Sequence, residues 1–215
     1  TPVSALLHAV AVVKAGVFGI IKVVIYIFGV ETLSITDAAS WLPYASGFTI
    51  IMASIIALNS NNLKRRLAYS TVSQLSYIIL AISMLNPYAI VASVFHLVAH
   101  AFGKITLFFA AGAIYTSLHK TEISELNGVG RQMPLTMIAF SLGVLCMIGL
   151  PISGGFISKW FLLSGAITDD QWFILFVIFL STLLNVAYFV PIIYRAFFLK
   201  PVTEEILLDN LDKKH

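Results

Sequence analysis

The chain has one cysteine and few charged residues, and both shortages restrict what it can be. Cys146 has no second cysteine to pair with among 215 residues, which excludes a disulfide-stabilised fold, and no Cys/His pattern of a metal site is present. Charged residues make up 11% of the sequence, against roughly 25% in an average domain. Together with a hydrophobic content of 59%, this low charge predicts a protein that crosses a membrane several times.

Several functional motifs are missing as well. No basic cluster with stacking aromatic residues is present, which argues against nucleic acid as a partner. Motifs for flavin, haem, iron–sulfur clusters and nucleotides are absent, so we predict no cofactor and no catalytic residue in this chain. Thr1 and Pro2 lead directly into an apolar segment without the basic region of a signal peptide. We therefore expect a fragment of a larger protein.

Apolar segments dominate what is present. About 20 apolar residues cross the hydrocarbon core of a bilayer as a helix, and six or seven candidate segments can be drawn. They cover residues 3–29, 41–58, 67–85, 88–118, 134–150, 156–167 and 172–199. The fold class that follows is all-α, a polytopic transmembrane helix bundle. Residues 1–199 form the membrane domain, and residues 200–215 form a polar tail.

The sixth segment is too short to span a membrane alone. Its 12 residues rise only ~18 Å as a helix, and the glycine- and proline-rich stretch 149–155 precedes it. Either a broken helix crosses the membrane in two halves, or a re-entrant turn is followed by a full span. We favour a broken helix near residues 149–171, with 156–167 and 172–199 as its halves, since broken helices line hydrated cavities in transporters.

The charges of the loops predict an orientation. Lys64, Arg65 and Arg66 lie in the loop 59–66 without an acidic residue, which places this loop in the cytoplasm by the positive-inside rule. Successive loops of a membrane-spanning chain lie on alternating sides of the membrane. Residues 119–131 and the tail are therefore expected on the cytoplasmic side, and the loops 30–40 and 86–87 on the opposite side.

The segment 88–118 contains no acidic residue, yet it carries His96, His100 and Lys104 at i, i+4 spacing. Ionisable groups at membrane depth are costly and mark ion or proton paths, and this spacing places all three near one helix face. A zinc site would need a third ligand, which the segment lacks, so we expect no metal. The remaining alternative is that the imidazoles only form hydrogen bonds to neighbouring helices.

Two further lysines lie within apolar segments. Lys14, which follows His8 in the first segment, and Lys159, in the short segment, are functional candidates, whereas Lys22 and Arg195 are better explained as interfacial anchors. All ten acidic residues lie outside the apolar cores, or at the predicted break in the case of Asp169 and Asp170. The buried lysines are therefore either partly neutral or paired with carboxylates elsewhere, and both states suit proton transfer.

The segment 67–85 is rich in hydroxyl groups. Ser70, Ser73 and Tyr77 share one face at i, i+3 and i+7. Such residues are ordinary packing material between membrane helices. The alternative is that these three hydroxyls hold water molecules that connect the lysines.

Four ordered sequence blocks carry a resemblance. They are TPVSALLHA at 1–9 with VKAG at 13–16, LKRRLAYSTVSQ at 63–74, FHLVAHAFGKITLF at 95–108 and LPISGGFISK at 150–159. With these blocks in this order, the chain resembles the antiporter-type subunits of respiratory complex I. Multi-subunit Mrp sodium/proton antiporters and membrane-bound hydrogenases contain subunits of the same type. The resemblance covers roughly residues 1–198.

The resemblance implies two inverted repeats, each with a broken helix, around a hydrated axis of basic residues. This chain would hold the second half of that fold. Lys14 matches the lysine that links two half-channels, and His8 matches a histidine near the first broken helix. The glutamate and first lysine of the family would lie upstream of Thr1.

The other matched positions imply a proton path. His96, His100 and Lys104 match the conducting row, and Lys159 matches the terminal lysine of the second broken helix. The expected function is proton translocation within a larger assembly of membrane subunits, with Na+ as a second ion in an Mrp-type antiporter. A bacterial or archaeal cell membrane is the expected location.

Alternatives to this function stay open. The chain could be a non-conducting scaffold, a subunit of a hydrogenase, or an unrelated carrier of organic anions with lysines as ligands. Within the family, the pattern GFISKWF at 155–161 favours the Mrp antiporters slightly over complex I.

Overall fold

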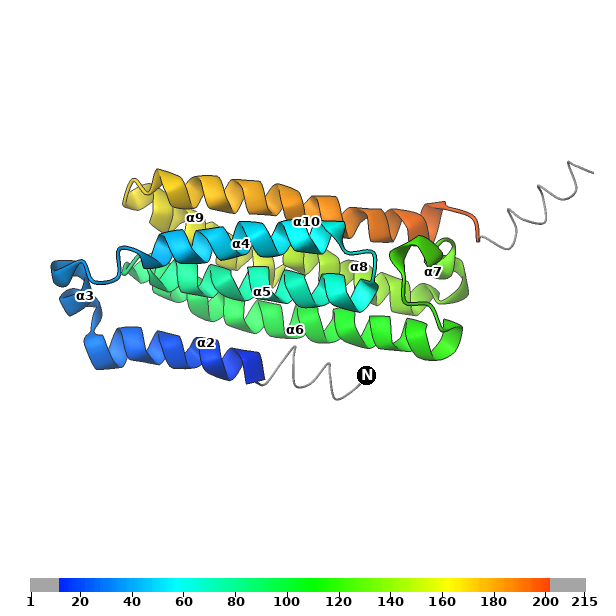
Figure 1. Cartoon of the computed structure of the whole chain (residues 1–215), viewed down its shortest axis with the longest axis horizontal. Coiled ribbons are helices and arrows are strands. Elements are labelled where there is room, and N and C mark those ends of the chain that lie inside the picture. Colours follow the sequence, from blue (N-terminus) through cyan, green and yellow to red (C-terminus); the bar gives the residue numbers. More distant parts are fainter. Residues whose placement is uncertain (1–11, 202–215) are drawn as a thin grey trace, which may run out of the picture.

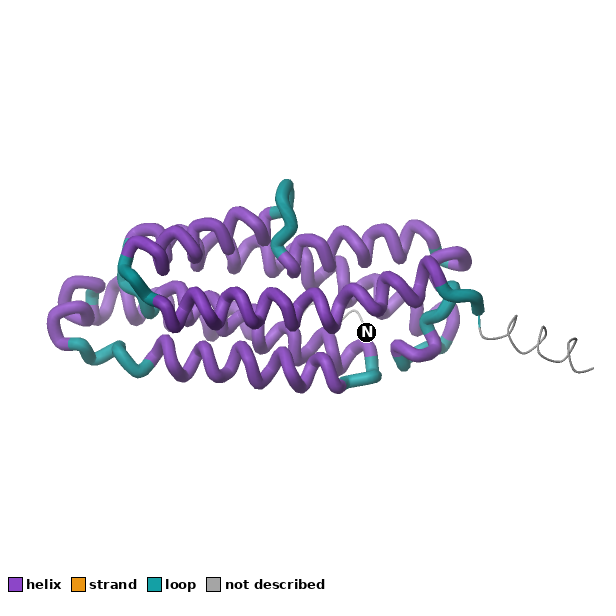
Figure 2. The backbone as a smooth tube through the Cα atoms, turned by 90° about the horizontal axis from the view of Figure 1, so that it is seen from above, coloured by secondary structure: helices purple, strands orange, loops and turns teal. Residues whose placement is uncertain are grey.

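The computed structural model describes residues 12–201, and the regular elements of this part are all helical, with one isolated β-bridge between Asn62 and Glu122 (Figure 1). The elements are α2 (Val12–Lys22), the π-helical turn η2 (Val23–Phe28), α3 (Val30–Thr36), α4 (Leu42–Asn59), α5 (Leu63–Ile82), α6 (Pro87–Leu118), the 3-10 turn η3 (Ile123–Glu125), α7 (Val129–Gln132), α8 (Pro134–Ile148), α9 (Gly154–Thr168) and α10 (Trp172–Phe198). The long helices lie side by side along one axis (Figures 1 and 2). The predicted all-α bundle is confirmed.

Local sequence signals explain where the helices begin. Asn62, Asn86 and Ser153 cap α5, α6 and α9, because each side-chain oxygen accepts a hydrogen bond from the backbone amide three residues on. Pro87 occupies the first turn of α6, where its missing N–H costs nothing. Gly149, at φ 85°, ends α8 in a left-handed conformation that glycine adopts readily.

Three helices, α4, α6 and α10, are long and apolar enough to cross a membrane. The pair formed by α2 with η2 and α3 meets the same criterion but bends by 79° at Gly29. The loop that we predicted over residues 30–40 therefore contains α3, a short helix that the sequence pattern did not reveal.

The predicted break near residue 149 is present, but the halves differ from our expectation. α8 and α9 have 15 residues each, and the connection between them lies at mid-length of the bundle (Figure 2). α6 packs against both halves along its length. α10 is a separate helix of 27 residues, so pairing 156–167 with 172–199 was wrong. The chain reverses between α9 and α10 because Asp170 takes a left-handed conformation and the Gln171 amide bonds back to the Ala166 carbonyl.

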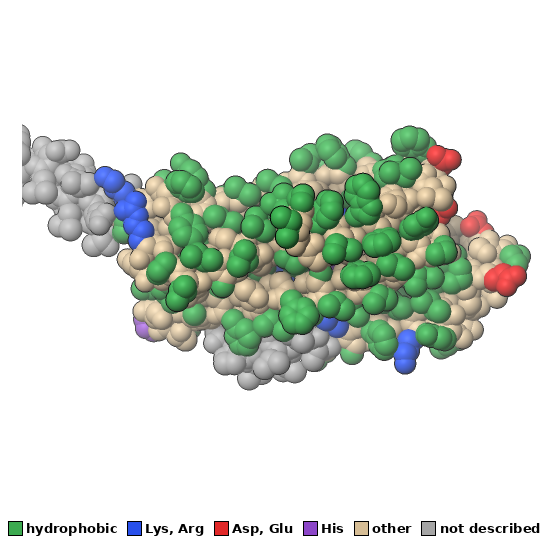
Figure 3. All heavy atoms as spheres, turned by 180° about the vertical axis from the view of Figure 1, so that it is seen from behind, with side chains coloured by type: hydrophobic (Ala, Val, Ile, Leu, Met, Phe, Trp, Pro, Cys, Tyr) green, Lys and Arg blue, Asp and Glu red, His purple; other side chains and the backbone are tan. Residues whose placement is uncertain are grey.

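The connections gather at two ends of the bundle, grouped as the charge pattern predicted. Backbone hydrogen bonds join residues 61–63 to residues 121–123, and the Gly128 amide donates to the Arg195 carbonyl at the end of α10. At the opposite end, the Asn86 amide donates to Asp169 over 2.6 Å. Acidic side chains mark one end of the face in Figure 3. Which end faces the cytoplasm stays a prediction, and residues 202–215 of the tail lie outside the described residues.

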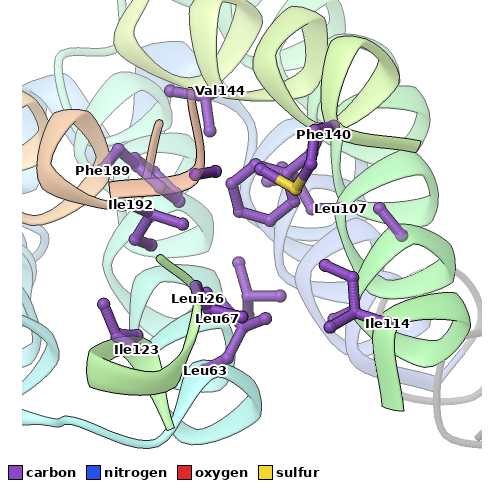
Figure 4. Packing of buried hydrophobic residues seen from close by; sticks show 14 of the residues in the cluster. Leu63, Leu67, Leu107, Ile114, Ile123, Leu126, Phe140, Val144, Phe189 and Ile192 are labelled. Carbon is purple, nitrogen blue, oxygen red and sulfur yellow. The ribbon is translucent and has the colours of Figure 1, made fainter. Parts of the chain in front are cut away.

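Apolar side chains cover the outside as well as part of the inside. Leu135 and Phe102 are 82% and 70% exposed, and apolar groups spread over the surface in Figure 3. Inside, Leu67, Leu107 and Phe140 belong to the largest buried apolar cluster, where α5, α6, α8 and α10 meet (Figure 4). An apolar exterior around a partly polar interior is the arrangement that a lipid environment favours.

Candidate functional site

The interior of the bundle holds a row of buried basic side chains from three helices. α2 contributes Lys14, α6 contributes His96, His100 and Lys104, and α9 contributes Lys159, each at most 8% exposed. The row borders α5, a helix with 14 buried residues out of 20 that brings many hydroxyl groups into the interior. The structure thus brings together the described residues that the sequence analysis assigned to a proton path. His8 lies outside the described residues.

Lys104 binds α5 from the middle of α6. Its ammonium donates a hydrogen bond to the Leu67 carbonyl over 3.1 Å and another to the Ser70 hydroxyl. The same group lies over the ring of Phe189 on α10, 5.6 Å from the centroid. The side chain is fully buried. Its hydrogen bonds within the described part of the chain therefore go to neutral oxygens of α5, and the contact with the Phe189 ring adds α10, so three helices meet at this lysine.

Lys159 occupies the break between α8 and α9. Its ammonium donates to the Ile148 carbonyl over 2.7 Å and to the Thr182 hydroxyl over 3.2 Å. Ile148 is the last residue of α8, where backbone carbonyls lack intrahelical partners and the helix dipole favours a cation. The break in the helix thus creates the carbonyl site that holds this lysine.

The two histidines lie between these lysines but differ in their contacts. His96 Nδ1 shares a hydrogen bond of 2.9 Å with the Ser158 hydroxyl of α9, and its ring stacks against Tyr77 at 5.5 Å. The rings of His96 and His100 are 6.4 Å apart. Neither ring nitrogen of His100 has a hydrogen-bond partner within the described residues. A purely structural role therefore fits His96, which binds a neighbouring helix, better than His100.

Lys14 extends the row toward α2. It lies close enough to Lys104 and His100 to act on both electrostatically. Lys14 thus lies beside the part of the row that Lys104 and His100 form, and His96 and Lys159 follow toward α9.

The three hydroxyl residues of α5 have different neighbours. Ser70 contacts Lys104, and the Tyr77 hydroxyl shares a hydrogen bond with Ser181 of α10, while the Tyr77 ring lies 5.4 Å from the Lys159 ammonium. Ser73 instead shares a hydrogen bond of 2.8 Å with Ser54 of α4. Ser70 and Tyr77 thus reach the lysines, whereas Ser73 joins two helices.

Sequence reasoning assigned no role to a set of polar residues that line the same interior. These are Gln74 on α5 and Ser181, Thr182, Asn185 and Tyr188 on α10, of which Gln74, Ser181, Asn185 and Tyr188 are fully buried. The spacing of Ser181, Asn185 and Tyr188 at i, i+4 and i+7 within an otherwise apolar helix was the signal that could have identified the α10 group.

Six buried polar atoms along this interior have no hydrogen-bond partner within residues 12–201. They are both amide atoms of Gln74, both ring nitrogens of His100, His96 Nε2 and Asn185 Nδ2. Leaving one such atom without a partner costs about 1–3 kcal/mol. Six of them would cost an amount similar to the whole stability of a domain, about 5–15 kcal/mol. Buried water normally provides partners for such groups, so the interior suits bound water.

Comparison with known proteins agrees with this architecture. A family model described as "NADH:quinone oxidoreductase/Mrp antiporter, TM" matches residues 1–185. NADH-quinone oxidoreductase subunit N of Desulforudis audaxviator is 38% identical over 148 residues, which are 69% of this chain and 30% of the relative. NADH-quinone oxidoreductase subunit L of Rickettsia bellii is 34% identical over 212 residues, which are 98% of this chain and 31% of the relative. The chain thus spans less than a third of the length of these curated relatives.

Solved structures show the same fold. A chain of the membrane-bound sulfane sulfur reductase, an archaeal respiratory membrane complex, matches with a TM-score of 0.82 at 25% identity, over 96% of this chain and 43% of the other. A chain of respiratory complex I from Thermus thermophilus matches with a TM-score of 0.76 at 22% identity, over 92% of this chain and 44% of the other. Given this fold and a family match over residues 1–185, the chain belongs to the NADH:quinone oxidoreductase/Mrp antiporter transmembrane family.

Proposed function

We propose that this chain is the proton-conducting part of a membrane subunit in a larger respiratory or antiporter complex. Protons move between Lys14, Lys104 and Lys159 through His96, His100 and bound water. Movement of charge along this row couples to the partner subunits. The ion is the proton, with Na+ as the counter-transported ion if the assembly is an Mrp-type antiporter.

One observation carries this proposal: Lys104 and Lys159 lie on the two sides of the pair formed by His96 and His100. Both lysines bind neutral oxygens of neighbouring helices. Both protonation states of such a lysine find partners, because carbonyl and hydroxyl oxygens accept from an ammonium and a hydroxyl can also donate to a neutral amine. Histidine has two ring nitrogens, and a neutral ring can accept a proton on one nitrogen and release a proton from the other. Neither ring nitrogen of His100 has a hydrogen-bond partner within the described residues, so His100 is suited to relay protons between the lysines.

The proposal includes a location and an orientation. The subunit lies in a bacterial or archaeal cell membrane, and the end that carries Lys64 and Arg65 faces the cytoplasm, where positively charged loops collect. Its partners are other membrane subunits of the assembly, in addition to the surrounding lipid.

The test replaces one lysine at a time in the intact assembly and measures ΔpH formation in membrane vesicles. Lys104→Met and Lys159→Met keep the length of the side chain and remove the titratable group. Each should lower the rate by roughly 10²-fold, the smaller end of what positioned acid–base groups contribute. Lys22→Met is the matched control, because Lys22 is an exposed residue of α2 that lies over the Phe18 ring at 5.2 Å.

The alternative is that the subunit only holds its neighbours in place. If assemblies with Lys104→Met and Lys159→Met contain all subunits and still form ΔpH at the rate of the unmodified protein, the chain is a scaffold and the proposal is wrong.

A further inference from the structure

α10 carries a polar stripe that faces a second stripe on α5. The members are Ser181, Thr182, Asn185 and Tyr188 on α10, and Ser70, Gln74 and Tyr77 on α5. Ser70, Gln74 and Tyr77 recur at intervals of four and three residues, as do Ser181, Asn185 and Tyr188, with Thr182 next to Ser181, and this spacing keeps each set on one side of its helix. The rest of α10 is almost entirely apolar. A polar stripe in such a helix is costly at membrane depth, and it needs a reason beyond packing.

Contacts connect this pair of stripes to both lysines. At one end, Ser70 binds Lys104 and lies beside the Tyr188 hydroxyl. The Tyr188 hydroxyl in turn donates to the Asn185 side-chain oxygen, and the Gln74 side chain lies next to it.

At the other end, the Thr182 hydroxyl accepts a hydrogen bond from Lys159. Ser181, one residue earlier on α10, is bound to Tyr77, whose ring lies against the same lysine. The stripes therefore extend from one lysine to the other.

Two amide side chains lie in the middle, and three of their four polar atoms lack a hydrogen-bond partner within the described residues. Both amide atoms of Gln74 and Nδ2 of Asn185 have no hydrogen-bond partner within the described residues, and both side chains are fully buried. The Gln74 backbone carbonyl lies beside His96, whose Nε2 is also without a partner there. These amide and imidazole groups supply donors and acceptors in comparable numbers, and they carry no negative charge. Water, which donates and accepts equally, is the ligand that fits such a set.

We propose that Gln74 and Asn185 hold a water cluster between α5, α6 and α10 that joins Lys104 to Lys159. The inference rests on the proposed function, since it assigns a path to protons that the lysines exchange. Amides do not titrate, so these two residues are positioning residues: they orient water molecules, and the water molecules and His96 carry the proton. Tyr188 and Ser181 fix the α10 side of the cluster.

The experiment replaces the amides with apolar groups of similar size in the complete assembly. Gln74→Met and Asn185→Leu, tested singly and together, should each slow ΔpH formation by roughly tenfold, less than loss of a titratable relay group would. Gln74→Asn and Asn185→Ser keep a hydrogen-bonding group and should recover most of the rate. Asn127→Leu is the control, because Asn127 also has a buried oxygen without a hydrogen-bond partner among residues 12–201 but lies in the connection between η3 and α7.

A second readout reports on the water itself. Infrared difference spectra recorded in ordinary and 18O-labelled water identify O–H bands of bound water molecules. Bands present in the unmodified assembly and in Asn127→Leu should be lost in Gln74→Met and Asn185→Leu. A structural defect alone would not remove these bands selectively. Gln74→Met is nearly isosteric, so it decides the question where Asn185→Leu prevents assembly.

The two proposals fail in distinguishable ways. If Gln74→Met and Asn185→Leu keep the full rate and the water bands while Lys104→Met and Lys159→Met lose transport, the amide site is refuted and the lysine path stands. If the lysine variants keep the full rate, the proposed function itself is refuted, and the water path with it.

Discussion

Replacing Arg66 by alanine should destabilise the bundle far more than the same change at Arg65. From the sequence we assigned both to a positively charged cytoplasmic loop over residues 59–66. In the structure Arg66 is only 8% exposed, and its guanidinium donates to the carbonyls of Ser60 (2.9 Å), Tyr188 (2.8 Å) and Leu58 (3.0 Å). Two of these carbonyls end α4 and the third belongs to α10, so one side chain joins α4, α5 and α10.

The size of the effect follows from these three bonds. A hydrogen bond to a charged group contributes about 1.5–3 kcal/mol. Three such bonds that share one guanidinium are not additive, so we expect a total loss of about 3–5 kcal/mol, which is more than one bond contributes but less than three separate bonds would. Arg65 is exposed and lies over the Tyr69 ring at 5.8 Å, a contact of about 0.5–1 kcal/mol. Since 1 kcal/mol shifts Tm by about 2–4 °C for a chain of this size, Arg66→Ala should lower Tm by about 6–20 °C and Arg65→Ala by only a few degrees.

The assay heats detergent-solubilised assembly that carries a fluorescent label on this subunit, and follows the remaining intact material by size-exclusion chromatography. Arg66→Lys should recover only part of the loss, because one ammonium lacks the planar fork that reaches three carbonyls at once. Equal shifts for Arg66→Ala and Arg65→Ala would refute the reasoning, since both variants remove the same charge from neighbouring positions.

Two more predictions concern local geometry. Gly155→Ala should destabilise the folded bundle by about 1–3 kcal/mol, because a Cβ there would overlap the Cys146 carbonyl oxygen. Gly154→Ala is the control, since its Cβ would come 3.3 Å from the Ala99 Cβ, and it should have a smaller effect in the same thermal assay. Equal effects would mean that α8 and α9 can separate freely. The backbone amides of Thr121 and the next residue donate to the Glu125 carboxylate over 3.1 Å and hold the pKa of Glu125 below its usual range. Because the pKa of Glu125 is lower in the folded chain than in the unfolded chain, these hydrogen bonds stabilise the turn fully at pH values above the usual carboxyl pKa. The stabilisation is lost as the pH falls through the pKa of the folded state. Hydrogen exchange at the Thr121 amide should therefore show a pH-dependent loss of protection, beyond the intrinsic exchange rate, that Glu125→Gln abolishes; an identical profile in that variant would contradict the assignment.

Helix positions were largely predictable because they depend on local signals. The segments 88–118 and 172–199 correspond to α6 (Pro87–Leu118) and α10 (Trp172–Phe198) within one residue at each end. Asparagine caps, prolines and long apolar runs are sufficient to set such limits. The prediction was poorer for α5, which begins at Leu63 rather than at residue 67, because its first turn is charged and reads as a loop.

The basic row was also visible in the sequence, since lysine and histidine are conspicuous in apolar helices. What the lysines bind was not visible. The Ile148 carbonyl becomes available to Lys159 only because α8 ends opposite α9, and Ser70 meets Lys104 only because α5 packs against α6. Gln74 and Asn185 gave a weaker signal, because single amides also occur as ordinary contacts between membrane helices.

The sequence by itself determined that this is an all-helical membrane protein with charge at its ends, basic groups at membrane depth and a break after Ile148, because hydropathy, caps and helix breakers act over a few neighbouring residues. Only the tertiary structure decided that α8 and α9 are the two halves of the break and that Arg66 is buried. It also decided that α10 presents a polar stripe to α5. In lipid, apolar faces of helices are nearly equivalent, so helix neighbours are selected by close packing and by polar contacts between distant residues. Those contacts exist only once the chain has folded.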